Sequence, residues 1–446
     1  MIRKLPKLNA LQTLALGFVI IIMIGTMLLM LPIASQNRES LAFLDSLFTA
    51  TSATCVTGLV VFDTYTQFSF FGQFVILILI QIGGLGFMTI AVLFSIIIGK
   101  RIGLKERINL MQSVNSPQVG GVVRLARRIL IVTAICELVG AGLLSIRFIP
   151  EFGVGKGIWF SVFHAISAFC NSGFDLMGTI APNVSLMPFA TDPLVVIVIL
   201  FLIVIGGLGF IVWNDIADHG LHFSNYRLHT KILLVFTGII ILTSTGLFLV
   251  FERQHTLVGY NPGEQLLLSL FSAITPRTAG FNTVQTVSLS EAGSGLTMLL
   301  MLIGAGPGST AGGIKITTLV VIFFSIVAHI RGKEDINLFG RRLEDSIIRK
   351  SFSSAAMYLL MLLTGVMTLF ALQDVAFLDG LFEGISAIGT VGLSRGITAS
   401  LSNPSQVVMI LLMYVGRVGS LAVAMAFVEH KTVAGLRNPV EKIIIG

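Results

Sequence analysis

Long apolar runs separated by short polar segments follow one another along the whole chain. Eight of these runs approach the roughly 20 residues that a helix needs to cross a bilayer. They are Leu11–Leu31, Phe70–Ile98, Ile129–Phe148, Pro193–Trp213, Ile232–Phe251, Thr297–Ile330, Ala355–Ala371 and Val407–Val428. The pattern therefore predicts an all-α polytopic membrane protein with eight transmembrane helices.

A shorter apolar stretch, too short to cross a bilayer, lies between the two long runs of each consecutive pair. The four stretches are Phe43–Leu59, Ile158–Phe174, Gln265–Phe281 and Phe377–Leu393. Each ends in small residues and glycine, which is typical of a short amphipathic helix followed by an irregular loop. We therefore expect four loops that enter the membrane without crossing it.

The same order of span, short helix, loop and span occurs four times. The loops end at Gly58, Gly173, Gly280 and Gly392, about 110 residues apart. A Phe precedes each glycine by nine or ten positions, and the hexapeptide Ile-Gly-Gly-Leu-Gly-Phe occurs at both 82–87 and 205–210. Four tandem repeats around a pseudo-fourfold pore are therefore predicted, at 1–108, 109–224, 225–338 (with a broken second span) and 339–446.

The composition supports a membrane protein and excludes other classes. Of the 446 residues, 54% are hydrophobic and 11% are charged, whereas a soluble domain has about 25% charged residues. A soluble enzyme, a disordered scaffold and a fibrous protein are thereby excluded. The three cysteines are too few and too scattered for a disulfide framework or a four-ligand zinc site.

The basic residues predict the orientation in the membrane. With a cytoplasmic N-terminus, most of the 29 Lys and Arg residues lie in cytoplasmic segments, and five lie outside: Arg38, Arg147, Lys156, Arg253 and Arg395. The positive-inside rule then predicts that both termini are cytoplasmic and that all four loops enter from outside the plasma membrane. Twelve outer acidic residues, among them Asp63, Asp175 and Glu383, favour the entry of cations.

Irregular backbone within a membrane is tolerated where protein buries it or where it lines a wet cavity. If the four loops meet on one axis, their carbonyl groups can form rings that replace the water shell of a cation, and such rings suit potassium. One such glycine is more often a turn or a helix C-cap, but four in register favour a pore. The candidate ion-binding residues, none of them acidic, are Thr54, Cys55, Val56, Thr57, Gly58, Phe169, Cys170, Asn171, Ser172, Gly173, Pro276, Arg277, Thr278, Ala279, Gly280, Ile388, Gly389, Thr390, Val391 and Gly392.

The four units resemble the Trk/Ktr/HKT superfamily of potassium transporters over essentially the whole chain. The resemblance is carried by Thr57-Gly58, Ser172-Gly173, Ala279-Gly280 and Val391-Gly392. Within the superfamily, the chain looks like the membrane subunit of a bacterial Ktr system. In plant relatives a Ser at the first filter glycine is associated with sodium; here that residue is Gly58, which favours potassium. The alternative is a sodium-selective or sodium-coupled transporter of the same fold.

The segment 304–315 interrupts the second span of the third repeat. Its five glycines and one proline cannot hold a regular helix, and a phosphate-binding P-loop is excluded because Ile314 stands where Lys is required. A packing kink is the preferred interpretation of the two hexapeptides. For 304–315 an intramembrane loop beneath the filter is preferred, and the resemblance implies that it is a gate. The candidate gate residues are Gly304, Gly306, Gly308, Ser309, Thr310, Gly312, Gly313, Lys315 and Arg417.

Two arginines are predicted at membrane depth, where a charge costs between ~3 and over ~10 kcal/mol and needs partners or water. Arg417 is expected to form the permeation barrier together with the glycine-rich loop; the alternative is a structural link to backbone carbonyls at helix breaks. Arg277 is expected to point away from the axis and to pair with an acid. Cys55 and Cys170 are interpreted as small packing residues rather than a metal pair.

The resemblance implies a membrane homodimer, with one pore per protomer, that binds a separate cytosolic nucleotide-binding ring of Rossmann type. The basic segments 100–128 and 331–350 could dock that ring. Potassium is then the substrate, sodium a possible coupling or regulatory ion, and no covalent cofactor or nucleic acid is involved. A coupled secondary transporter would show inverted repeats, and a membrane enzyme would need a catalytic constellation within the spans, so both are less favoured.

Overall fold

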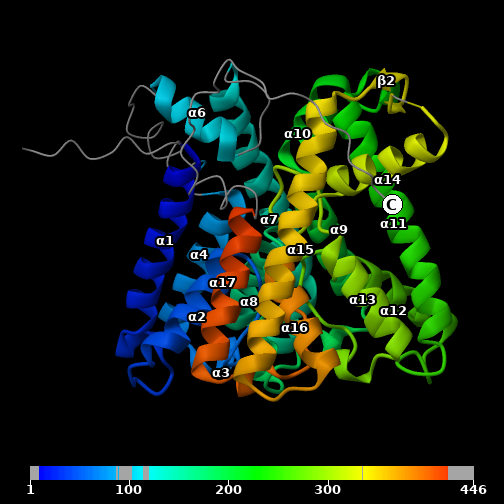
Figure 1. The fold of residues 1–446 in the computed structure, drawn as a ribbon. Helices are drawn as coiled ribbons and strands as arrows, with labels where there is room; N and C mark the ends of the chain where they lie inside the picture. Colours follow the sequence, from blue (N-terminus) through cyan, green and yellow to red (C-terminus); the bar gives the residue numbers. More distant parts are fainter. Residues whose placement is uncertain (1–9, 87–88, 90–102, 114–119, 334, 420–446) are drawn as a thin grey trace, which may run out of the picture.

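The computed structural model describes residues 10–86, 89, 103–113, 120–333 and 335–419 (Figure 1). These residues form a bundle of helices, and the predicted all-α class is confirmed. Two short strands, β1 (Asn337–Leu338) and β2 (Arg341–Arg342), pair antiparallel at the upper end of the molecule in Figure 1. The predicted span segments 90–98 and 420–428 lie outside the described residues.

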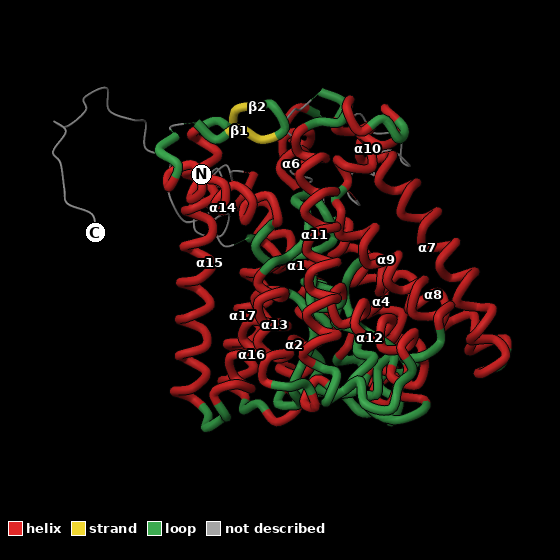
Figure 2. Tube along the Cα trace, turned by 90° about the vertical axis from the view of Figure 1, so that its right-hand side faces the viewer, coloured by secondary structure: helices red, strands yellow, loops and turns green. Residues whose placement is uncertain are grey.

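Within the described part of the chain, four helices are long and apolar enough to cross a membrane: α1 (Ala10–Leu29), α7 (Val122–Phe152), α11 (Leu228–Phe251) and α15 (Asp345–Leu372). They extend between the two ends of the molecule (Figure 1, Figure 2). The bent pair α9 (Pro193–Leu208) and α10 (Phe210–His219) is a fifth candidate. The chain is a multi-pass membrane protein, while the division into eight spans and four repeats stays a prediction.

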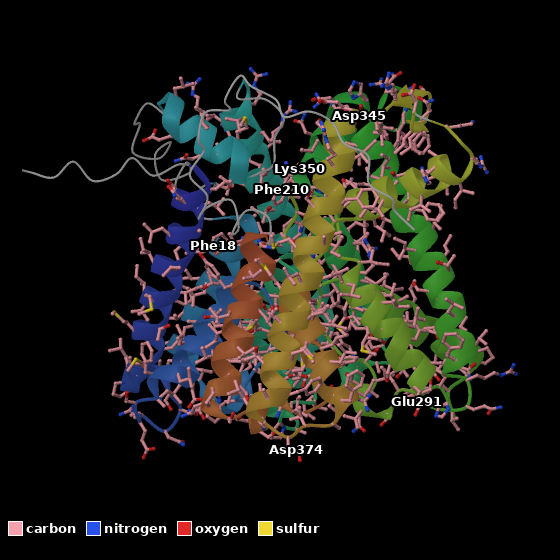
Figure 3. All side chains as sticks on the ribbon, viewed as in Figure 1. Phe18, Phe210, Glu291, Asp345, Lys350 and Asp374 are labelled. Atoms are coloured by element: carbon pink, nitrogen blue, oxygen red, sulfur yellow. The ribbon has the colours of Figure 1, made fainter. Side chains whose placement is uncertain are left out.

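The long helices expose large apolar side chains to their surroundings. Met27 on α1, Leu138 on α7, Leu242 on α11 and Met367 on α15 are all more than 60% exposed. Burying such side chains in lipid removes apolar surface from water, which is favourable. The labelled charged residues lie near the two ends, with Asp345 and Lys350 at the upper end and Glu291 and Asp374 at the lower end (Figure 3).

A short helix precedes each of the four predicted loops. These helices are α2 (Phe43–Thr54), α8 (Val154–Phe169), α12 (Pro262–Ile274) and α16 (Phe377–Gly389). The start of α12 is fixed by a capping box between Asn261 and Glu264 and by Pro262 in its first turn. The repeated phenylalanines are fully buried and anchor the four helices in the core: Phe48, Phe163, Phe271 and Phe382.

The helices that follow the loops break at glycine. α4 (Phe70–Leu85) ends at Gly86, α9 ends at Gly209 and α17 (Asn403–Val418) ends at Gly419, with φ of 79°, 98° and 98°. Positive φ is readily accessible to glycine and costly for other residues. Within the predicted span Pro193–Trp213, the chain bends by 93° between α9 and α10. The kink predicted at this hexapeptide is therefore a full helix break.

The predicted interruption of the third repeat's second span is present. α13 (Glu291–Leu302) and α14 (Ile316–Ile330) are separated by the irregular segment 303–315. Two further helices, α3 (Thr64–Gln67) and α6 (Leu104–Ser113), lie near the lower and upper ends of the molecule (Figure 1). Loops gather at the lower end and extend into the bundle (Figure 2), which is where the candidate site lies.

Candidate functional site

The four loop glycines form a closed ring. A Cβ atom added to any of them would lie within 2.8 Å of a carbonyl oxygen in the neighbouring loop. The four pairs of glycine and carbonyl are Gly58 with Ser172, Gly173 with Ala279, Gly280 with Val391, and Gly392 with Thr57. The loops therefore meet in chain order around a common centre, and a larger residue at any of the four positions would collide with backbone.

The same backbone conformation recurs in all four loops. Each ring glycine has a φ between 71° and 93°. The residue two positions before each glycine also has positive φ: Val56, Asn171, Thr278 and Thr390. Three of these are β-branched, for which the left-handed region is a genuine outlier that costs about 1–3 kcal/mol. Backbone strain repeated at equivalent positions is typical of functional sites.

In three of the four loops, the first residue of the candidate filter lies outside this ring. Thr54 and Phe169 end their short helices, and Ile388 lies one residue before the end of α16. Their carbonyl oxygens lie close to glycines of the helix that follows each loop. The pairs are Thr54 with Gly83, Phe169 with Gly206 and Ile388 with Gly416. Because these oxygens face neighbouring helices, the loops approach one another only nearer their glycine ends.

A buried hydroxyl behind each loop holds its glycine end. Gly58 donates its N–H to Ser52 Oγ and Gly392 donates to Ser386 Oγ, both at 3.1 Å. In the other two loops, the hydroxyls of Ser167 and Thr275 donate to the carbonyl oxygens of Phe174 and Phe281, at 2.6 and 2.7 Å. The sequence prediction missed these hydroxyls, although a Ser or Thr five or six positions before each glycine is a repeated signal.

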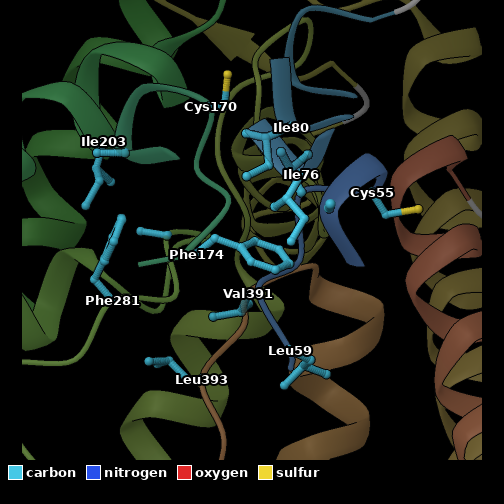
Figure 4. Packing of buried hydrophobic residues seen from close by; sticks show 14 of the residues in the cluster. Cys55, Leu59, Ile76, Ile80, Cys170, Phe174, Ile203, Phe281, Val391 and Leu393 are labelled. Atoms are coloured by element: carbon cyan, nitrogen blue, oxygen red, sulfur yellow. The ribbon is translucent and has the colours of Figure 1, made fainter. Parts of the chain in front are cut away.

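Large apolar side chains follow the ring glycines and fix the loops in the protein. These are Leu59, Phe174, Phe281 and Leu393, all no more than 3% exposed. Figure 4 shows them, with Val391, coming from separate segments within one packed region. The loops are therefore held from behind by apolar packing and by the hydroxyl hydrogen bonds.

A cavity of about 400 Å³ lies beside the ring and is lined by all four glycines. Asp63 and Asp175 also line it. Asp175, in the loop between α8 and α9, accepts the N–H of Met177 at 2.9 Å. Burial raises the pKa of Asp175 to about 7, and the neighbouring Asp63 raises it as well. The Glu383 carboxyl, in contrast, is fully buried on α16 and accepts the hydroxyl of Thr398.

The segment 303–315 lies against two of the loops. Thr310 donates its hydroxyl to the Phe169 carbonyl at 3.1 Å and also bonds the Asn171 side chain at 3.0 Å. A Cβ on Gly312 would collide with the Thr390 hydroxyl. The segment therefore contacts the loops of the second and fourth repeats directly.

The same segment is tied to the breaks in the helices around it. Gly306 donates its N–H to the Gly207 carbonyl at 2.9 Å, and Phe210 donates to the Gly308 carbonyl at 2.8 Å. At its base, Gly304 donates to Ile314 at 2.9 Å. The Lys315 ammonium folds back and donates to the carbonyls of Ala311 and Gly312, at 2.7 and 3.0 Å.

Arg417, in the last turn of α17, bridges this segment to α4. Its guanidinium donates to the Thr310 carbonyl and to the carbonyls of Gly83 and Gly84. The last carbonyls of a helix have no partners within the helix, and a cation at this end is favourable. Arg417 therefore makes the backbone contacts expected of a structural link. A role as a permeation barrier is compatible with these contacts.

Arg277 is buried, with 6% exposure, and its Nε has no hydrogen-bond partner among the described residues. Within the described residues, no acidic side chain forms an ion pair with Arg277. The expected acidic partner is therefore not found there. Cys55 and Cys170 are both free and buried, and Cys170 packs on Gly84. Within the described ranges no cluster of three or more His, Cys, Asp or Glu residues could hold a metal ion.

A family model described as TrkH, cation transport protein, matches residues 8–433. The chain belongs to this family. The predicted resemblance to the Trk/Ktr superfamily is thereby confirmed, and TrkH proteins are transport proteins rather than enzymes by description.

Relatives of this TrkH-family chain match it over nearly its whole length. The Ktr system potassium uptake protein B of Bacillus subtilis is 42% identical over 98% of this chain and 96% of its own. The potassium/sodium uptake protein NtpJ of Enterococcus hirae is 40% identical over 100% of this chain and 99% of its own. The solved potassium transporter TrkH from Vibrio parahaemolyticus has a TM-score of 0.76 and covers 96% of this chain and 86% of its own, at 16% identity, which supports the fold.

Proposed function

We propose that this TrkH-family protein takes up potassium across the plasma membrane through a channel-like pore. The closed ring of Gly58, Gly173, Gly280 and Gly392 is the observation that carries the proposal. A ring built from four chain segments can surround a single ion with equivalent backbone groups. One of the relatives above is named as a potassium uptake protein and another as a potassium/sodium uptake protein, and both names support the choice of ion.

The proposed filter uses backbone oxygen in place of water. In each loop, positive φ at the glycine and two residues before it alternates with negative φ between them, an alternation that can turn successive carbonyl groups to one side. The oxygens nearest the ring belong to Thr57, Ser172, Ala279 and Val391. Without an acidic ligand, a dehydrated monovalent cation suits such a site, and Asp63 and Asp175 in the outer cavity would concentrate cations at its entrance.

The proposed gate consists of 304–315 and Arg417. Contacts of Thr310 with Phe169 and Asn171 support a position directly beneath the filter. A guanidinium ~8 Å from a passing ion adds a barrier of roughly 2 kcal/mol at an effective dielectric near 20. Because Arg417 donates to Thr310, loop and charge would move as one unit.

A substitution series at Arg417 separates the barrier from the structural link. If the charge forms a barrier, Arg417→Gln and Arg417→Ala both raise the uptake rate, by up to about thirtyfold, and Arg417→Lys does not. If the residue is only a link, Arg417→Gln, which keeps N–H donors, behaves as the parent. Initial rates of rubidium uptake provide the measurement, and unchanged rates in both neutral variants would remove Arg417 from the gate.

We further infer that four tandem repeats with eight spans surround the pore and that both termini are cytoplasmic. In the same arrangement, a membrane homodimer would bind a separate cytosolic nucleotide-binding ring that controls opening. The word "system" in the name of the Bacillus subtilis relative supports a partner subunit. The basic residues of 331–350, at the upper end of the molecule, are the proposed contact surface.

Uptake measurements test the proposed function. Expression in a potassium-starved host is expected to produce rubidium uptake that potassium inhibits and that excess sodium inhibits much less. A second candidate, uptake of sodium or sodium-coupled transport, is supported by the name of the Enterococcus hirae relative. Sodium entry without rubidium entry would favour sodium selectivity, sodium-dependent rubidium entry would favour coupling, and absence of both fluxes would contradict the proposal.

A further inference from the structure

Two adjoining cavities between α7 and α10 form a groove that the proposed pore does not use. The first, of about 200 Å³, is mainly apolar and is walled by Ile129, Val132, Phe169, Phe210 and Trp213. The second, of about 230 Å³, lies at the N-terminal end of α7. Leu125, Arg128 and Asn214 line both cavities, so an apolar pocket opens into a polar one.

The polar cavity carries a net positive charge. Arg124, Arg128 and Arg227 line it, against one carboxylate, Asp218. Arg128 pairs with Asp218 at 2.8 Å, and Arg227 lies 3.8 Å from the buried Asp215. No ion pair involves Arg124 among the described residues. Arg124 therefore leaves the cavity with an unneutralised guanidinium group that suits a phosphate.

The apolar cavity lies against a helix that is long and apolar enough to cross a membrane. α7 is one of the four long apolar helices, and its first turns carry the arginines. Trp213, of a residue type enriched at membrane interfaces, lines the pocket. The hydroxyl of Thr133, another lining residue that is 2% exposed, has no hydrogen-bond partner among the described residues. An ester oxygen entering the pocket would supply one.

We propose that this groove binds an anionic phospholipid, with its phosphate at Arg124, Arg128 and Arg227 and an acyl chain in the apolar cavity. Charge complementarity selects this occupant, because basic pockets between membrane helices bind anionic headgroups. The adjoining apolar volume excludes a free phosphate as the natural ligand, since it would leave that volume empty.

The groove contacts the glycine-rich segment through two of its wall residues. The carbonyl of Phe169 accepts the Thr310 hydroxyl at 3.1 Å, and the N–H of Phe210 donates to the Gly308 carbonyl at 2.8 Å. Phe210 lies in the upper half of the bundle (Figure 3). An acyl chain that fills the cavity therefore fixes two anchors of the segment 303–315. This regulatory consequence, unlike the lipid binding itself, rests on the proposed gate.

Quenching of Trp213 fluorescence tests the lipid site. Trp159→Phe leaves Trp213 as the single tryptophan of the chain. This parent is reconstituted in phosphatidylcholine vesicles that contain a small fraction of phosphatidylglycerol, with bromine on the acyl chains of either lipid. Brominated phosphatidylglycerol is expected to quench Trp213 more strongly than an equal fraction of brominated phosphatidylcholine.

Matched variants locate the effect. Arg124→Ala combined with Arg128→Ala should lower the apparent affinity for phosphatidylglycerol at least fivefold, and Val132→Phe should abolish the preference by filling the cavity. Arg127→Ala, an exposed position that lines neither cavity, should keep it. Retention of helical circular dichroism and of a monodisperse elution profile verifies folding of each variant.

Equal quenching by the two lipids, or absence of quenching, would overturn the proposal and would indicate a neutral lipid or a segment of this chain in the groove. Rubidium uptake by the same vesicles is measured separately. Preferential quenching without a dependence of uptake on phosphatidylglycerol would keep the lipid site and contradict only its connection to the gate.

Discussion

The side chains that support the ring are small, buried and polar. One hydroxyl supports each loop, and the four residues that carry these hydroxyls are Ser52, Ser167, Thr275 and Ser386. The main-chain carbonyl of the same residue accepts the N–H of the residue that precedes the ring glycine. A buried hydrogen bond of this kind contributes about 0.5–1.5 kcal/mol. That amount is comparable with the difference in binding free energy by which a site selects between two similar cations. These hydroxyls are therefore expected to affect selectivity.

Ser52→Ala should lower the preference for rubidium over sodium by about two- to tenfold, because the N–H of Gly58 loses its acceptor. The measurement is rubidium uptake with sodium as the competitor. Ser46→Ala on the same helix is the matched control, since the Ser46 hydroxyl is buried and has no partner among the described residues. Equal selectivity in the two variants would exclude a positioning role for Ser52.

The cavity lined by Asp63 and Asp175 should make uptake depend on pH. With its pKa raised to about 7, Asp175 is neutral at pH 5.5 and charged at pH 8. A negative charge ~8 Å from the entering ion contributes ~0.5 to ~2 kcal/mol at dielectrics between ~80 and ~20. The KM for rubidium should therefore fall about two- to thirtyfold as the pH rises through this range.

Asp175→Asn should remove this component of the pH dependence and hold the KM near its acidic value. Asp374→Asn, at an exposed position at the same end of the molecule, should leave the pH profile unchanged. A KM in Asp175→Asn that still falls with rising pH as in the parent would contradict the assignment.

At the scale of elements, the hydrophobic pattern predicted much of what is observed. The short helices α2, α8, α12 and α16 occur within or beside the predicted stretches, because their apolar faces must be buried. The kinks predicted at the hexapeptides 82–87 and 205–210 coincide with the helix ends at Gly86 and Gly209, whereas the helix end at Gly419 was not predicted, since one positive φ leaves no trace in hydrophobic periodicity. The carbonyl partners of Arg417 could not be predicted either, because backbone oxygen has no sequence signature.

The close packing between each loop and the helix that follows it can be tested without a transport assay. Gly206→Ala in α9 places a methyl group against the carbonyl oxygen of Phe169 and should destabilise the protein by about 1–3 kcal/mol. Gly238→Ala in α11, with no atom within 4 Å, should be neutral or stabilising by up to ~1 kcal/mol. Thermal unfolding in detergent compares the two variants. Equal unfolding midpoints would contradict the close contact between Gly206 and the Phe169 carbonyl.

At the scale of the whole molecule, the long helices with exposed apolar faces form the outer layer, and strained loops occupy the interior. Isolated loops with positive φ at Val56, Thr278 and Thr390 would relax. They persist because the surrounding bundle fixes both ends of each loop and because apolar side chains such as Phe174 pack behind them. The sequence predicted that the loops converge, whereas the contacts between neighbouring loops required the folded chain.

The central claim is that the four loops surround a dehydrated monovalent cation. Crystals grown with thallium or rubidium in place of potassium, measured at the absorption edge of the ion, test it most directly. The account predicts anomalous peaks on the common axis, among the carbonyl oxygens of Thr57, Ser172, Ala279 and Val391 beside the ring glycines. A ring without such a peak, in crystals that bind the ion elsewhere, would contradict it.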